Sequence, residues 1–298
     1  MFSKNKEEGR SLSWQELFEL GKESIQQFLL GDSFMHGAAL AYYAVFALIP
    51  IIYLAISFFG LIVGQDRIIE IAGELIKNNM GIVDISTLTE LMYKAGLGGG
   101  STTFYRAIGI IAVIFTSTAM FNSLSKSINV FYGIKITKKH RAFLNQLLKR
   151  LISFGVMAAL ASTVIILYFA QSLLIAFSTE LLSYIGIEKG FVSSLIEHLS
   201  IIFINFIGFM MIFKYVHDAR VSWKLAMTGA FFTAILLYFG QLLINYYLIN
   251  YFYANNIGIA GTILIILSWI FYTSQIIFIG ATYTSFYAKK SGNPILPK

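Results

Sequence analysis

The chain has 298 residues and a formal net charge of +7, with 57% hydrophobic and only 12% charged residues. A water-soluble domain carries roughly 25% charged residues, so this chain cannot cover itself with polar surface, and the bilayer is its expected solvent. The absence of cysteine excludes disulfides, thiolate catalysis, Cys-ligated zinc and iron–sulfur clusters.

The first 35 residues are predicted to form a cytoplasmic or interfacial amphipathic segment (1–35) rather than a signal peptide. They mix basic and acidic residues and lack a compact apolar core before a small-residue cleavage site. Ser13 and Glu16 have the spacing of a capping box, which predicts a helix start. We expect the helix to lie in the inner membrane interface, with its apolar face in lipid or against the bundle. That face is predicted to carry Trp14, Leu17, Phe18, Gly21, Ile25, Phe28 and Leu29.

Six later segments are long and apolar enough to cross a bilayer, which takes roughly 20 residues per helix. The last two come from one uncharged run of 64 residues, which is too long for one helix and is predicted to break at 254–261. The fold class is therefore an all-α membrane protein, with six transmembrane helices in one domain over 36–288 and a cytoplasmic tail over 289–298. The predicted spans are 37–64, 107–125, 151–179, 191–216, 225–253 and 262–288.

The distribution of basic residues orients these spans. The N-terminal segment, the second and fourth connections and the C-terminal tail hold 17 Lys and Arg, whereas the alternate side holds 5. Cytoplasmic loops carry the excess of positive charge, so both termini are predicted to be cytoplasmic.

The first span contains Pro50 together with three tyrosines, Tyr42, Tyr43 and Tyr53. Proline has no amide hydrogen, so the carbonyl of Phe46 loses its helical partner and the helix is predicted to bend there. Two interpretations stay open. The bent helix lines a cavity with the tyrosine hydroxyls as polar handles, or the bend only fits an ordinary packed bundle.

Small and polar residues inside the spans are the other candidates. Gly37 and Ala41 lie on a small-residue stripe that lets another helix approach closely. Buried amides need hydrogen-bond partners, so the amide side chains either line a polar pathway or link helices together. The candidate amides are Gln171, Asn205, Gln241, Asn245 and Gln275.

Ionisable and catalytic groups are scarce in the predicted membrane region. Glu197 is at an outer boundary and no acid is at mid-membrane, which argues against simple ion-coupled symport. The four histidines are scattered without metal-ligand spacing, and the basic run 138–141 is typical of a positive-inside loop. We expect no enzyme activity, no cofactor, no metal and no nucleic-acid partner.

Several stretches resemble the YihY/BrkB family of bacterial inner-membrane proteins. "GAALAYYAVFALIP" at 37–50 is similar to the family's opening signature, and "SINVFY" at 127–132 to its motif after the second span, with Asn129 at the matching position. The strongest similarity is C-terminal, at "VSWKLAMTGAFFTAIL" and "NIGIAGTILIILSWIFYTSQIIFIGA". The residues that match there are Trp223, Gly229, Ala230, Gly258, Gly261, Trp269, Tyr272, Gln275, Gly280 and Ala281.

The resemblance implies six transmembrane helices with both termini inside and a location in the bacterial inner membrane. It also implies helix-packing roles for Gly229, Gly258, Gly261 and Gly280. Some family members are linked to envelope and lipopolysaccharide traits or to serum resistance. An old ribonuclease label for the family has no chemical support in these residues, which offer no metal or acid–base cluster.

Two positions depart from the family pattern. Thr282 stands where members usually carry glutamate, which puts any coupling by that acid in doubt here. His217 stands where many have proline, so a different local turn is expected.

Together these observations predict a transporter or flippase-like exporter of a lipid or amphipathic solute, with membrane lipids as partners. The alternative is a non-transporting envelope scaffold or assembly protein that uses the same helices only for packing.

Overall fold

The computed structural model describes most of the predicted helices. It covers residues 12–80, 103–134, 189–247 and 258–297, together with separate helical positions between 148 and 177. The predicted span at 151–179 is therefore described only in part.

The N-terminal helix α1 (Trp14–Leu30) begins as the capping-box spacing predicts. The Glu16 backbone N–H donates to Ser13 Oγ at 3.3 Å, and the Ser13 N–H donates to Glu16 Oε2 at 2.8 Å. Two backbone donors at the helix start are thereby satisfied. This prediction is confirmed.

The apolar residues of α1 divide between two faces. Gly21 and Phe28 are buried where α1 packs on α9, together with Leu20 and Ser24. Trp14 and Phe18, in contrast, are 87% and 67% exposed. Only part of the predicted stripe therefore meets the other helices, and its placement in the membrane interface stays a prediction.

Helices α2 (Ser33–Val63) and α3 (Gln65–Met80) form a helical hairpin. Gly64 joins them with a φ of 97°, a left-handed conformation that glycine adopts without steric strain. Helix α3 packs back along α2 and buries Ile68 and Ile69. Its charged side remains open, where Arg67 and Glu70 form an exposed ion pair.

Helix α5 (Thr103–Phe131) packs along α2, and α7 (Lys189–Tyr215) packs along α8 (Trp223–Tyr247). The long uncharged run contains two helices, α8 and α9 (Gly258–Lys290). The predicted break at 254–261 extended too far, because α9 already begins at Gly258, and the rest of that break lies outside the described residues. Within the described residues, three segments are long and apolar enough to cross a membrane. They are Ser194–Tyr215, Trp223–Ile244 and Ile263–Lys290.

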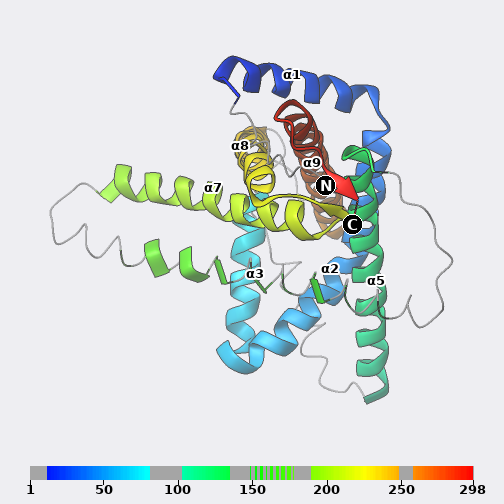
Figure 1. The fold of residues 1–298 in the computed structure, drawn as a ribbon. Coiled ribbons are helices and arrows are strands. Elements are labelled where there is room, and N and C mark those ends of the chain that lie inside the picture. The colour runs from blue at the N-terminus through cyan, green and yellow to red at the C-terminus, as the bar shows by residue number, and fades with distance from the viewer. Residues whose placement is uncertain are drawn as a thin grey trace, which may run out of the picture.

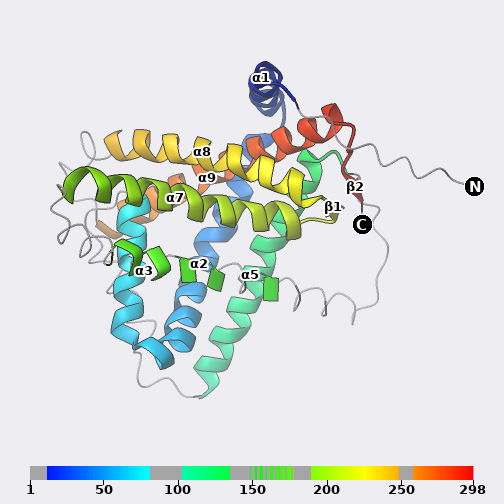
Figure 2. The ribbon, with the colours of Figure 1, turned by 60° about the vertical axis from the view of Figure 1, so that its left-hand side comes forward.

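Helix α9 is the centre of the arrangement, since it contacts α1, α2, α5 and α8. Figure 1 shows α1 lying across one end of the molecule. In Figure 2, α7 and α8 run side by side, while α2, α3 and α5 form a second group that runs across them. The fold is thus a helical assembly with two groups of helices joined through α9.

The C-terminal segment folds back on the connection between α7 and α8. Strands β1 (Ala219–Arg220) and β2 (Leu296–Pro297) pair antiparallel, with Ala219 opposite Pro297 and Arg220 opposite Leu296. The last residues therefore hold the α7–α8 connection at the end where α9 finishes (Figure 2).

Candidate functional site

Glycines set the distance between α8 and α9. A Cβ at Gly229 would lie 1.8 Å from Thr284 Oγ1, and one at Gly280 would lie 1.8 Å from Thr233 Oγ1. Both threonine hydroxyls donate to a carbonyl of their own helix, Thr233 to Gly229 and Thr284 to Gly280. Each glycine therefore faces a threonine of the other helix. The two helices can pack closely there while both threonine hydroxyls keep a hydrogen bond.

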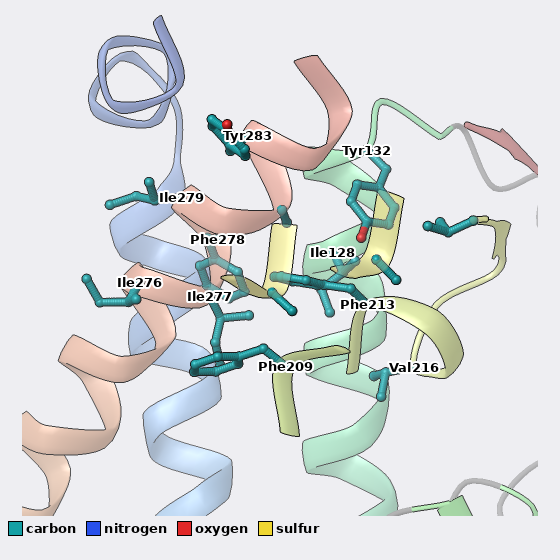
Figure 3. Close-up of a cluster of buried hydrophobic side chains, with 14 of the residues drawn as sticks. Ile128, Tyr132, Phe209, Phe213, Val216, Ile276, Ile277, Phe278, Ile279 and Tyr283 are labelled. Carbon is teal, nitrogen blue, oxygen red and sulfur yellow. The ribbon is translucent and has the colours of Figure 1, made fainter. Parts of the chain in front are cut away.

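The same contact closes over an aromatic core. Figure 3 shows side chains of α5, α7 and α9 gathered around Phe213, which is fully buried beside Phe278 and Ile128. Phe213 also reaches the space beside Gly229 and Gly280. The end of α7 is thereby held against α8 and α9.

Asn129, in α5, holds the connection that follows α7. Its Nδ2 donates to Asp218 Oδ2 at 3.2 Å, and its Oδ1 accepts the Asp218 backbone N–H at 3.1 Å. Asn129 is only 1% exposed, so both amide groups are satisfied by one residue that is distant in sequence.

His217 shapes the same turn from within. Its Nδ1 accepts the Ala219 N–H, so its Nε2 carries the proton and donates to the Phe213 carbonyl. The buried imidazole is thus neutral in this arrangement, and its two nitrogens bond the backbone carbonyl of Phe213 and the backbone N–H of Ala219.

Tyr132 follows α5 and packs edge-on against the His217 ring, with centroids 4.9 Å apart. Burial raises the pKa of the Tyr132 phenol well above its usual range, and the nearby Thr284 hydroxyl offsets this only in part. Thr284 Oγ1 donates to the Gly280 carbonyl and keeps lone pairs that can accept, but the Tyr132 hydroxyl makes no hydrogen bond of ordinary geometry within the described part of the chain.

The most unusual polar group is Gln275 of α9. It is 8% exposed, and neither its Nε2 nor its Oε1 has a hydrogen-bond partner among the residues that the structure describes. The side chain lies against Gly37 of α2, where a Cβ would come within 1.8 Å of Nε2. The missing side chain of Gly37 thus leaves room for an amide that no described residue pairs with.

One turn further along α9, His36 of α2 packs edge-on against Phe278. Its Nδ1 is 3.0 Å from Ser127 Oγ of α5, which itself donates to the Ser123 carbonyl. His36 Nδ1 therefore carries the proton in this contact. Polar groups of α2 and α5 thus meet α9 beside the unpaired amide.

The other sequence candidates are dispersed. Tyr42 and Tyr43 lie on the exposed face of α2, where the Tyr42 ring packs tilted against Phe46, so they do not join Gln275. Ala41 is buried in the same helix. Gln241 is buried in α8, while Asn205 Nδ2 and Gln171 Oε1 are buried with no hydrogen-bond partner in the described ranges. Pro50, Tyr53, Asn245, Gly258 and Gly261 lie in helices, but their side-chain surroundings are outside the described part of the chain.

Sequence reasoning missed the contacts that join α5, α8, α9 and the α7–α8 connection. Asp218 and the Thr233–Gly280 and Gly229–Thr284 pairs were not singled out as partners. The spacing of four between glycine and threonine on each helix was the available signal, since residues four apart share one helix face.

Both residues that depart from the family pattern make local hydrogen bonds, His217 in the turn after α7 and Thr282 within α9. Thr282 is 2% exposed and its hydroxyl donates to the Phe278 carbonyl, so the buried hydroxyl at this position has a hydrogen-bond acceptor.

Among the described residues, no three His, Asp or Glu side chains gather closely enough to hold a metal ion.

Long apolar helices of this kind, several in one chain, define a polytopic α-helical membrane protein. The chain belongs to the BrkB family: the family model described as "Virulence factor BrkB" matches residues 24–297.

Two curated relatives are 26% identical to the chain over 275 residues, or 90% of this chain. Both are named UPF0761 membrane proteins, from Stenotrophomonas maltophilia strains K279a and R551-3. The chain spans 61% of the length of these relatives. No solved structure matches.

Proposed function

We propose that this protein is a transporter or flippase-like exporter of a lipid or amphipathic solute in the bacterial inner membrane. It crosses the bilayer six times, with both termini in the cytoplasm, and it is not an enzyme. Support for the topology comes from charge distribution and helix length. Helix α2 has 31 residues, which extend about 46 Å at 1.5 Å per residue.

The unpaired amide of Gln275 carries the proposal. An unpaired polar group in an apolar interior costs about 1–3 kcal/mol, so a helix-linking role would normally pair it with a neighbouring helix. Gln275 offers one acceptor and two donors to a visiting polar group while apolar helices surround it. An amphipathic cargo supplies the missing partner and tolerates the apolar surroundings.

The lack of buried acidic side chains in the described residues bears on how transport could be energised. Among the described residues, the buried polar side chains are Ser, Thr, Asn, Gln and one His, with no carboxylate. Coupling by an intramembrane acid therefore has no candidate in that part of the chain. Uncoupled movement of a neutral or zwitterionic polar group fits this composition best.

Gln275→Leu tests the proposal directly. Leucine keeps the volume against Gly37 but removes the donor and acceptor, so we expect at least about a tenfold loss of transport with stability unchanged or higher. The measurement is dithionite accessibility of NBD-labelled phosphatidylglycerol and phosphatidylethanolamine in proteoliposomes.

Gln27→Leu is the matched control, because the same substitution falls on an exposed position of α1. Transport by Gln275→Leu at the control rate removes this residue from the mechanism. No movement of either lipid or of an amphipathic dye by the unmodified protein overturns the transport proposal itself.

Pro50→Ala addresses the first span. Restoring the amide hydrogen allows a hydrogen bond to the Phe46 carbonyl, so we expect a straighter α2, lower transport and stability that is unchanged or raised. Inter-spin distances across α2 and the proteoliposome assay give the two readouts. Full transport by a straightened helix excludes the proline from the mechanism.

The envelope scaffold is the second candidate, and the exposed face of α1 favours it. Trp14, Phe18 and Leu29 remain exposed outside the helix contacts, as a docking face requires. Native mass spectrometry of protein extracted gently from its own membrane separates the two functions. A discrete lipid or metabolite that is lost in Tyr42→Ala/Gln241→Ala supports transport, whereas a stoichiometric protein partner supports the scaffold.

A further inference from the structure

Basic residues from distant parts of the sequence gather at one end of the molecule. The Gly229–Thr284 and Thr233–Gly280 contacts make α8 antiparallel to α9. The start of α8 therefore lies beside the end of α9, and β1 links it to the end of α7 (Figure 2). This end, called the basic end here, carries Lys214, Arg220, Lys224, Lys289 and Lys290.

Little negative charge opposes these cations. Within the described residues 214–224 and 284–297, Asp218 is the sole acid. Its Oδ2 already accepts a hydrogen bond from Asn129, and its backbone N–H donates to the same residue. His217 is neutral in its hydrogen-bonding arrangement, so it adds no charge of its own. The described residues 214–224 and 284–297 thus carry five cations against one acid and are net positive, while α1, which packs on α9, adds Glu16, Glu19 and Glu23.

Two exposed aromatic rings stand among the cations. Tyr215 and Trp223 are both exposed and meet edge to face, with centroids 6.0 Å apart. Lys214 Nζ lies 5.1 Å from the centre of the Trp223 ring and donates to the Val221 carbonyl. An ammonium has three donors, so Lys214 is held in place with donors to spare.

We propose that the basic end binds the headgroup of an anionic phospholipid of the cytoplasmic leaflet. Tyr and Trp prefer the level of the lipid headgroups, because their rings have an apolar body and a polar atom. Lys and Arg beside them meet the phosphate and are attracted by the negative surface of that leaflet. Free phosphate engages the cations alone, whereas a phospholipid also contacts the exposed rings through its glycerol and acyl groups.

This site is separate from the Gln275 amide and holds a resident lipid rather than cargo. It orders three elements, the end of α7, the start of α8 and the end of α9, around one phosphate group. The proposal stands whether or not the protein transports, and its test measures binding alone.

Titration of the delipidated full-length protein with dioleoylphosphatidylglycerol and with dioleoylphosphatidylcholine, followed by native mass spectrometry, tests this assignment. We expect clear preference for phosphatidylglycerol, and about tenfold weaker binding by Arg220→Gln/Lys224→Gln, since both side chains are exposed and their charges face the headgroup. Lys22→Gln/Arg67→Gln removes the same net charge from α1 and α3 and should bind like the unmodified protein.

Three outcomes overturn the proposal. Equal affinity for the two lipids shows that the headgroup charge is not recognised. Equal weakening in both double variants shows general charge attraction rather than a site. Displacement of phosphatidylglycerol by inorganic phosphate at equal concentration, with no effect of Trp223→Ala, assigns the site to free phosphate instead.

Discussion

Gly280→Ala is expected to lower the free energy of unfolding by about 1–3 kcal/mol, the usual range for an added methyl group in a closely packed interior. The new Cβ would lie 1.8 Å from Thr233 Oγ1 and 3.1 Å from Phe213 Cζ. Thr233 cannot easily rotate away, because its hydroxyl is bonded to the Gly229 carbonyl and a β-branched side chain has few helical rotamers. The helices must separate instead.

Unfolding in mixed micelles of increasing SDS fraction, followed by tryptophan fluorescence, measures this effect. Gly208→Ala in α7 is the control, since a Cβ there meets nothing within 4 Å. It should leave stability unchanged or raise it by up to about 1 kcal/mol, because alanine favours helix more than glycine does.

A second substitution tests whether contact with Thr233 causes the loss of stability in Gly280→Ala. Thr233→Ala in the Gly280→Ala background removes the nearest atom, so part of the lost stability should return. Equal stability of Gly280→Ala and Gly208→Ala would contradict the close contact of α8 and α9 at this register.

Local sequence chemistry predicted the start of α1. The Ser13–Glu16 capping box forms because both partners lie within one helical turn. The presence of two helices in 225–288 was predicted from length, since a single helix over the uncharged run would far exceed the bilayer, but the break was placed at 254–261 and α9 already begins at Gly258. These predictions needed no knowledge of the tertiary contacts.

The surroundings of each helix face were harder to predict. Periodicity shows that Gly21 and Ile25 lie near each other on α1, but only Gly21 is buried against the bundle. The amides raise the same difficulty: the sequence placed Gln275 in a span, while its isolation depends on Gly37, which is 238 positions earlier. Contacts between distant segments have no local signature.

Asn129→Asp is expected to destabilise the protein by about 1–3 kcal/mol, the range for a buried hydrogen bond replaced by an unsatisfied group. The substitution exchanges the Nδ2 donor for a second carboxylate oxygen, which then faces Asp218 Oδ2. Asn129 is 1% exposed, so water cannot screen the repulsion from that side. The Asp218 N–H bond to Oδ1 survives, which limits the loss.

The control is Asp218→Asn, whose side-chain oxygen still accepts from Asn129 Nδ2. Asp218 is exposed, so this variant should lie within about 0.5 kcal/mol of the unmodified protein. In the double variant Asn129→Asp/Asp218→Asn, the amide at 218 donates to the carboxylate at 129. The loss caused by Asn129→Asp should therefore be smaller in the Asp218→Asn background.

A double-mutant cycle from SDS unfolding curves gives the interaction between positions 129 and 218. A favourable coupling places the end of α5 against the α7–α8 connection, as the hydrogen bonds require. Additive losses would show that the two residues do not interact, so that β2, His217 and Lys214 hold that connection without Asn129. Arg220 lies in β1 and Lys224 at the start of α8. Measuring phosphatidylglycerol binding for the same four proteins of the cycle therefore shows whether the Asn129–Asp218 hydrogen bonds also position the basic end.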